Sequence, residues 1–434
     1  MSVPNPREVI TTKALTVWVA AMLVYIMAIT GRTSFGVAGL EAIDRFQVDA
    51  SRIAVFTTVQ VGIYALAQIP TGILIDKYGP RKLLVIGAVI MGLGQTLLGV
   101  TSNYWVAIGA RLLIGAGDAT AFLSVMRILP YWFPLHRTPM FTQVTSSLGQ
   151  LGQFISAVPF SLFLGWAGWT TAFVSLGAVG ILIALAAAVA VADSPESAGI
   201  LDAPKEQPNS QTQTVRARLR HVLRSPVAWQ AFFIHYIGMI TANVFALLWG
   251  IPMMTQGLGV PKTQAGWVLT WLSVCVVLAG PLHGNISSRA RGYRPWLAIA
   301  LTLAHMSAWA LFFAFGGSYL SLFILMVAVA LCSPAANYGF DIVRENMDRS
   351  VVATATGLGN MGGFTATMLG AQLFGMSLSR VGEHPHYTIA DFRTAAVAVA
   401  LVWAVGIIGV VATHLARKRQ GGDEGPRVTI VDVG

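Results

Sequence analysis

The sequence predicts an all-α integral membrane protein with twelve transmembrane helices arranged as two six-helix repeats. The chain is 55% hydrophobic and 11% charged, with a mean hydropathy of +0.67, whereas a soluble domain carries about 25% charged residues. Apolar runs of about 20 residues, the length that crosses a bilayer, recur along it. Backbone groups in lipid must be hydrogen-bonded within their own segment, so we expect each run to be a helix.

Six apolar runs precede a polar break and six follow it. The first six span Leu15–Gly39, Ile53–Ile75, Leu83–Val100, Tyr104–Ile128, Met140–Leu164 and Trp169–Val191. The second six span Trp229–Met253, Ala265–Ile286, Trp296–Phe315, Tyr319–Phe340, Val351–Leu378 and Phe392–Leu415. Two equal sets of helices indicate an internal duplication.

The polar break sets the expected domain boundaries. Residues 1–192 form an N-terminal six-helix bundle, 193–226 a cytoplasmic linker, 227–416 a C-terminal six-helix bundle and 417–434 a cytoplasmic tail. The basic segment Val215–Arg224 of the linker has two interpretations: a surface helix on the inner leaflet, or a solvated stretch.

The distribution of basic residues predicts the orientation. The net charge is +10, and 20 of the 28 Lys and Arg residues fall in segments that are cytoplasmic if the N-terminus is. This positive-inside bias places both termini in the cytoplasm of a multi-pass plasma (inner) membrane protein. It also explains the basic excess by membrane topology, so we expect the lipid bilayer and no nucleic acid as a partner.

Neither a cleaved signal nor a cysteine framework is indicated. The first apolar run, of about 25 residues, is too long for a signal-peptide core. Cys275 and Cys332 both fall inside predicted helices, so we expect no disulfide, metal site or cofactor.

The stretch Gly72-Ile-Leu-Ile-Asp-Lys-Tyr-Gly-Pro-Arg-Lys82 reads as a tight, charged loop at a membrane surface. Gly72 lets two helix ends approach closely, and Gly79 permits the turn between them. Asp76 is the only acid of a loop that also holds Lys77, Arg81 and Lys82. Its carboxylate can accept bonds from a helix end or from a charged partner.

This loop resembles the signature G-x-L-x-D-[RK]-x-G-x-[RK]-[RK] of the major facilitator superfamily of secondary transporters. The resemblance implies alternating access, with solute bound between two six-helix halves near mid-membrane. It also implies that Gly72, Asp76, Lys77, Gly79, Arg81 and Lys82 form a gating loop. A degenerate copy without the acid occurs at Gly284–Gly292, between the eighth and ninth runs.

The fourth run carries Arg111 and Asp118, two charges that are expensive in a membrane and therefore point to function. Seven residues apart, they share nearly one helix face and lie about 10 Å apart along it. The segment is similar to the second motif of the superfamily, R-x-x-x-G-x-G-x-A, whose arginine is associated with proton coupling. We expect proton coupling here; the alternative is a structural ion pair.

Arg32 lies in the first run, within Thr30–Gly36. In the anion:cation symporter branch of the superfamily, an arginine in a similar segment is associated with anionic substrates. Arg32 is therefore a candidate substrate contact, although no acid adjoins it and its long side chain could instead snorkel to water.

Further polar residues of the predicted cavity helices are candidate substrate contacts. They are Gln143, Gln150, Tyr236, Asn243 and Asn337. His235 could titrate near neutral pH, but we interpret it as a hydrogen-bonded packing residue. Gly357–Gly363 is similar to one part of the nitrate/nitrite porter signature, and close helix packing explains its glycines equally well.

We therefore expect a secondary active transporter that works by alternating access as a monomer, with proton-coupled uptake of a small polar or anionic solute. The alternatives are a nitrate/nitrite-type porter, an efflux antiporter or a transporter-like solute sensor. No G-x-x-x-x-G-K-[ST] phosphate loop and no H-E-x-x-H or G-x-S-x-G motif occurs, which argues against an ATP-driven pump and an enzyme.

Overall fold

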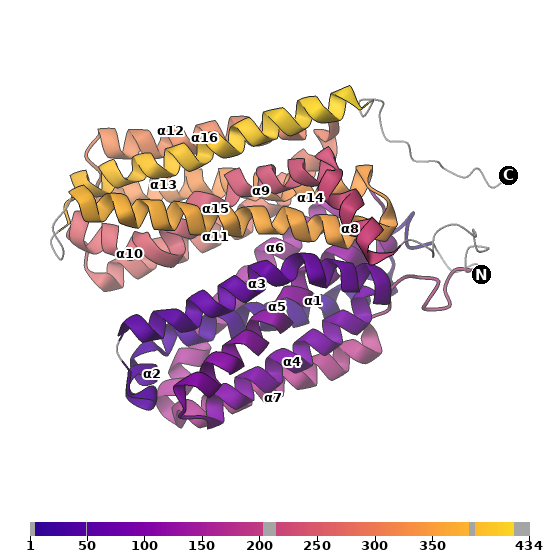
Figure 1. Ribbon diagram of the computed structural model, residues 1–434, viewed down its shortest axis with the longest axis horizontal. Helices are drawn as coiled ribbons and strands as arrows, with labels where there is room; N and C mark the ends of the chain where they lie inside the picture. The colour runs from indigo at the N-terminus through magenta and orange to yellow at the C-terminus, as the bar shows by residue number, and fades with distance from the viewer. Residues whose placement is uncertain (1–4, 49, 203–213, 382–386, 421–434) are drawn as a thin grey trace. The chain divides into compact units, whose positions relative to one another are not determined.

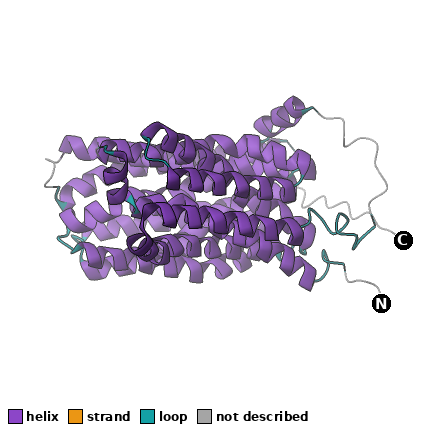
Figure 2. Ribbon diagram, turned by 90° about the horizontal axis from the view of Figure 1, so that it is seen from below, coloured by secondary structure: helices purple, strands orange, loops and turns teal. Residues whose placement is uncertain are grey.

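The computed structural model describes residues 5–48, 50–202, 214–381 and 387–420, and within these ranges it contains helices and turns but no strand (Figures 1 and 2). The chain divides into two compact units. The first comprises residues up to Arg220 together with Ser350–Gly357, and the second comprises His221–Arg349 and the residues from Leu358 onward. Part of the predicted linker (203–213) and most of the predicted tail (421–434) lie outside the described residues.

The first unit contains the first six predicted runs. Its helices are α1 (Thr12–Val37), α2 (Gly39–Phe46), α3 (Ala50–Tyr78), α4 (Pro80–Val100), α5 (Tyr104–Trp132), α6 (Thr138–Ile155), the π-helical turn Ser156–Phe160 and α7 (Ser161–Ala190). A break at Gly168, with φ 75° and ψ 170°, lies between the predicted fifth and sixth runs. Helix α8 (Val215–Arg224) forms from the basic segment, and the division between the units falls within it.

The second unit is less regular. Its elements are α9 (Pro226–Val244), α10 (Gly250–Pro252) with π-helical turns on both sides, α11 (Lys262–Arg289), α12 (Arg294–Ala314), α13 (Tyr319–Cys332), α14 (Tyr338–Asn346), α15 (Val352–Val381) and α16 (Ile389–Arg419). The predicted seventh run is thus interrupted by π turns, and a 3₁₀ segment (Ser333–Asn337) splits the predicted tenth run. Helix α15 begins within the first unit and continues in the second.

Nine helical stretches of the described chain are long and apolar enough to cross a membrane, and one of them, Thr138–Ala190, holds both the fifth and the sixth predicted runs. The seventh and eleventh predicted runs are also helical, but they do not meet this criterion of helix length and apolarity. Helices therefore occupy all twelve predicted runs.

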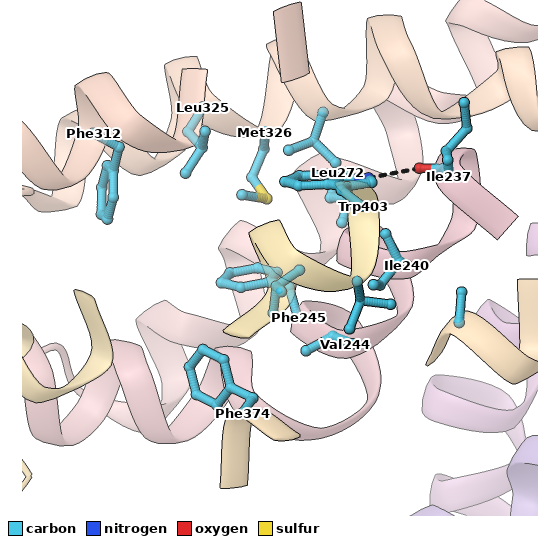
Figure 3. Packing of buried hydrophobic residues seen from close by; sticks show 14 of the residues in the cluster. Ile237, Ile240, Val244, Phe245, Leu272, Phe312, Leu325, Met326, Phe374 and Trp403 are labelled. Atoms are coloured by element: carbon cyan, nitrogen blue, oxygen red, sulfur yellow. Dashed lines mark hydrogen bonds between the residues drawn. The ribbon is translucent and has the colours of Figure 1, made fainter. Parts of the chain in front are cut away.

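Apolar side chains from several helices of the second unit meet in one core (Figure 3). Phe245 and Val244 extend from the end of α9 toward Phe374 of α15 and Trp403 of α16. The indole nitrogen of Trp403 donates to the carbonyl oxygen of Ile237 at 2.7 Å. This bond satisfies the one polar atom of a side chain that is buried in the core.

In the first unit, glycines let helix backbones touch. A Cβ atom added at Gly117 of α5 would overlap the carbonyl oxygen of Gly87 on α4, and one added at Gly177 of α7 would lie 2.5 Å from the carbonyl oxygen of Gly92. Membrane helices associate mainly through such close packing, because lipid provides no hydrophobic driving force between them.

We predict that Gly117→Ala destabilises the protein while Gly109→Ala, on the same helix, does not. A Cβ at position 109 meets nothing within 4 Å, whereas one at 117 forces α4 and α5 apart. Overpacking of this kind costs roughly 1–3 kcal/mol, and alanine at an open helix position is neutral or favourable. Thermal unfolding of the two purified variants in detergent measures the difference, and equal midpoints would contradict the α4–α5 packing.

Candidate functional site

A buried ion pair joins α1 to α5 within the first unit. Arg32 Nε donates to Asp118 Oδ2 at 2.6 Å, and Arg32 Nη2 donates to Oδ1 at 2.9 Å. The Asp118 side chain is 0% exposed and that of Arg32 is 22% exposed. Two parallel charge-assisted bonds of this kind fix both side chains and are among the strongest polar contacts in proteins.

Aromatic side chains surround this pair. The Arg32 guanidinium lies over the ring of Tyr64 of α3, 4.3 Å from its centroid. Tyr25 of α1 lies close enough to interact electrostatically with both Arg32 and Asp118. Arg32 is therefore held by an acid and an aromatic face. This placement disfavours the alternative in which its side chain snorkels to water.

The predicted partnership of Asp118 with Arg111 takes a different form. Asp118 pairs with Arg32, while Arg111 points along α5 to lie over Phe35, 4.8 Å from the ring centroid. The seven-residue spacing does place both residues on one side of α5, but it leaves them about 10 Å apart along the axis, too far for direct contact. Arg111 acts on Asp118 only as a second nearby positive charge.

The remaining predicted contacts lie in varied surroundings. Gln143 is buried, while Gln150 is partly exposed on α6 beside Gly149, whose Cα faces Tyr25. Asn243 Nδ2 donates to Thr367 Oγ1 at 3.1 Å, and Asn337 is buried in the 3₁₀ segment. Tyr236 belongs to the apolar core against Gly406, a position that favours packing.

His235 has the surroundings of a packing residue. It is 4% exposed, and its Nδ1 donates to the carbonyl oxygen of Ala336 at 3.1 Å. The ring also lies 4.7 Å from that of Phe340. The hydrogen bond fixes the proton on Nδ1, because a carbonyl oxygen only accepts.

Asp76 binds the beginning of α15. Its carboxylate accepts from the backbone N–H groups of Ala353 (3.0 Å) and Thr354 (2.8 Å) and from the Thr354 hydroxyl (2.7 Å). Arg127 Nε of α5 lies 3.3 Å from Asp76 Oδ1. The first N–H groups of a helix lack internal partners and carry a partial positive charge, so a carboxylate there satisfies both needs.

Gly72 allows that contact. A Cβ at Gly72 would lie 2.6 Å from Thr354 Cα, so only glycine lets α3 approach the α15 backbone. The structure also corrects the extent of the predicted loop: α3 continues to Tyr78 and α4 begins at Pro80, which places Gly72, Asp76 and Lys77 on a helix. The turn is Gly79 alone, at φ 88°.

The second half of the motif contacts the last turn of α7 and the segment that follows it. Arg81 donates from its backbone N–H to Asp193 Oδ1 at 2.7 Å and from Nε to the carbonyl oxygen of Ala188 at 3.0 Å. The Lys77 ammonium lies 4.8 Å from the centroid of the Tyr78 ring, and the Lys82 side chain is exposed.

The N-terminal segment contacts the same region, because Arg7 Nη1 lies 2.8 Å from Glu196 Oε1. Partial burial raises the pKa of the Glu196 carboxyl, but hydrogen bonds from its own backbone N–H and from Ser194, together with Arg7, outweigh it and hold that pKa below the usual value.

In the second unit, the degenerate copy of the loop is accompanied by ion pairs on α14. Asp341 accepts from Ser287 Oγ and pairs with Arg344 at 3.0 Å. The buried Arg294 donates to both oxygens of Glu345, at 2.6 and 3.0 Å. The acid that the copied loop lacks is thus supplied by α14.

The sequence reasoning missed Tyr64, Gln60, Gln95 and Arg294. Gln60, Tyr64 and Gln68 recur every four residues in an apolar run, and this spacing marks one polar face of a helix. Arg294 opens the helix directly after the degenerate loop, a position at which basic residues are common. The pairing with Glu345 is visible only in three dimensions.

The fold and the loop geometry agree with a comparison against protein families, in which residues 21–250 match the model of the Major Facilitator Superfamily. The chain belongs to this superfamily. It is therefore a multi-pass integral membrane protein and a secondary transporter of a small-molecule solute, not an enzyme.

Several bacterial proteins are similar in sequence. A protein of Agrobacterium vitis named as a tartrate transporter is 24% identical over 375 residues, 80% of this chain and 84% of that one. The protein GarP of Escherichia coli, named as a galactarate/D-glucarate transporter, is 22% identical over 87% of this chain and 90% of its own. The match to SauU of Cupriavidus necator, named as a sulfoacetate transporter, is 29% identical over 40% of each chain.

Solved structures share the fold. The fucose:proton symporter FucP of Escherichia coli has a TM-score of 0.66 at 16% identity, covering 92% of this chain and 99% of its own. A bacterial homologue of the human lysosomal transporter Spinster gives 0.55 at 15% identity, over 93% and 96%. These likenesses support the predicted twelve-helix architecture.

We predict that Asp76→Asn slows every mode of transport, because it weakens the carboxylate contact with the first turn of α15. A change of about 1.4 kcal/mol in the barrier corresponds to roughly a tenfold change in rate. Initial rates of uptake and of exchange in proteoliposomes measure the effect. Asp44→Asn, the same change at an exposed acid of α2, is the control, and wild-type rates in Asp76→Asn would exclude a gating role.

Proposed function

We propose that the protein is a proton-coupled importer of a small organic anion, located in the inner membrane with both termini in the cytoplasm. The observation that carries this proposal is the buried, bidentate pair between Arg32 of α1 and Asp118 of α5. A buried carboxylate and guanidinium that neutralise each other are suited to couple the uptake of a proton by the acid to the binding of an anion by the arginine.

The proposed step is an exchange of partners. While Asp118 is ionised, it occupies the guanidinium of Arg32. Protonation removes its charge and converts one accepting oxygen into a hydroxyl, so the bidentate ion pair with Arg32 is lost. Arg32 then needs another anion, because an unpaired cation in this environment is costly. Binding of an anionic solute and uptake of a proton thereby depend on each other.

The similar proteins support the anionic class of solute. Sulfoacetate, tartrate and galactarate, which appear in the names of three of them, are all small organic anions. FucP supports only the fold, since its similarity to this chain is 16% identity.

The contacts at Asp76 support alternating access as the transport cycle. Helix α15 starts against Gly72 and Asp76 and continues into the second unit. Contacts at its first turn can therefore influence the rate of the transport cycle. We propose that the protein works as a monomer and binds no nucleic acid, because the positive-inside bias accounts for its basic residues.

The glycine-rich stretch of α15 gives no support to a nitrate/nitrite porter. A Cβ at Gly357 would lie 2.5 Å from the carbonyl oxygen of Gln68, and one at Gly362 would overlap that of Phe232. Close packing of helix backbones therefore accounts for these glycines.

The direct test is proton uptake in proteoliposomes exposed to small organic anions, nitrate, amino acids and sugars. We expect alkalinisation of the outer medium with at least one organic anion and none with neutral sugars. Proton flux with sugars alone, or with no compound in the panel, would contradict the proposal.

We predict that Asp118→Asn retains expression and solute exchange but loses uphill accumulation driven by a proton gradient. Asparagine resembles the protonated acid, so Arg32 stays available while the proton site is gone. Counterflow and gradient-driven uptake of the same radiolabelled anion separate the two effects.

Asp44→Asn is the matched control, since Asp44 is exposed on α2 and its loss should change neither measurement. Unchanged accumulation in Asp118→Asn would exclude the coupling role.

A further inference from the structure

Arg111 is a buried cation, 1% exposed, whose Nε and Nη1 atoms have no hydrogen-bond partner among the described residues. Its guanidinium lies over the face of Phe35, 4.8 Å from the ring centroid, with Asp118 as a nearby negative charge. Leaving a buried charge without hydrogen bonds carries a large free-energy cost, so a site of this kind calls for an anion that the chain itself does not provide.

Two glutamines on the helices that pack against this part of α5 also lack partners. Within the part of the chain that the structure describes, neither side-chain polar atom of Gln60 on α3, which is 1% exposed, has a hydrogen-bond partner, and the Oε1 atom of Gln95 on α4 has none. Gln95 Nε2 donates to the carbonyl oxygen of Gly31, one turn before Phe35 on α1.

The helices that carry these glutamines converge on the same part of α5. Gly115, one turn after Arg111, packs against Gln60, and Gly94, next to Gln95, packs against Ala110, next to Arg111. Two helices, α3 and α4, thus bring polar groups without hydrogen-bond partners to the part of α5 that carries Arg111.

The charges near this cluster do not balance. Arg32 and Asp118 neutralise each other, and Arg127 compensates Asp76 at the other end of α5. Arg111 leaves a surplus of one positive charge. Protonation of Asp118 raises this surplus to two positive charges, one on Arg32 and one on Arg111. The two guanidinium groups lie over different aromatic rings, those of Tyr64 and Phe35.

We propose that Arg111, with Gln60 beside it, binds the second acidic group of a dianionic substrate whose first acidic group binds Arg32. This inference rests on the proposed function, because it takes Arg32 as the first anion contact. The amide of Gln60 can donate to the same acidic group, and the apolar face of Phe35 beneath the guanidinium excludes water from it. The site then selects small molecules with two acidic groups over those with one.

The test is ligand-dependent thermal stabilisation of the purified full-length protein, which requires no transport. The probes are tartrate, succinate and sulfoacetate as dianions, and lactate and glycolate as monoanions. We expect the wild type to bind at least one dianion about tenfold or more tightly than any monoanion, since a site with buried polar groups discriminates strongly against ligands that leave them unpaired.

Arg111→Gln should remove this preference while monoanion binding through Arg32 stays within about twofold. Arg111→Lys retains the charge and should keep part of the preference. Arg45→Gln is the matched control, because Arg45 binds the backbone carbonyls of Thr101 and Gly99 and is not one of the proposed ligand contacts. The unfolding midpoints of the unliganded variants show whether each has folded.

The outcomes separate this inference from the proposed function. Equal binding of monoanions and dianions, or a preference that survives in Arg111→Gln, overturns the role of Arg111. So does the absence of binding by every probe. Dianion binding that depends on Arg111, without proton-coupled transport, supports the subsite and contradicts the proposed function.

Discussion

The cost of placing charge in a hydrocarbon environment shapes this protein more than any other constraint. Within the first unit, Asp118 and Arg32 are tolerated because each satisfies the other through two hydrogen bonds. Since the partners come from α1 and α5, the same bonds fix the relative rotation of these helices. In the proposed mechanism, a change in the charge of Asp118 also changes what Arg32 binds. The bonds that hold the two helices together are then the same bonds that the proposed transport step breaks.

The same need to satisfy a buried charge applies at the N-terminal end of α15, where close backbone contacts make it possible. Asp76 accepts two backbone N–H bonds there only because Gly72 brings α3 within van der Waals distance of Thr354. A larger residue at position 72 would separate the carboxylate from the helix end and leave the first N–H groups of α15 without it. The glycine and the acid therefore act together. Their four-residue spacing, one helical turn, places both on the same side of α3.

The sequence was sufficient to predict the twelve helical runs and the Gly79 turn, and it left a helix end and a charged partner open for Asp76, which binds both. These features depend on local composition, on one glycine conformation and on a motif. It was not sufficient to predict the partner of Asp118. Arg111 was the nearest cation in sequence, but helix geometry separates the two, and Arg32 reaches the acid from 86 residues away. The interruptions at Ser333–Asn337 and in the π turns after α9 also escaped prediction, because an apolar run does not reveal local changes in backbone hydrogen bonding.

The two units differ in the kind of polar side chains that they bury. In the second unit, buried polar side chains are mostly neutral and hydrogen-bonded, as with His235 on the Ala336 carbonyl and His305 beside Thr241. Its buried ion pairs lie on α14 next to the loop that lost its acid. The first unit instead carries ionisable groups midway along α5. Neutral groups can orient a solute without a change in protonation, whereas the proposed mechanism requires Asp118 and Arg32 to exchange partners. The proposed function therefore assigns proton and anion recognition to the first unit and leaves neutral polar contacts to the second.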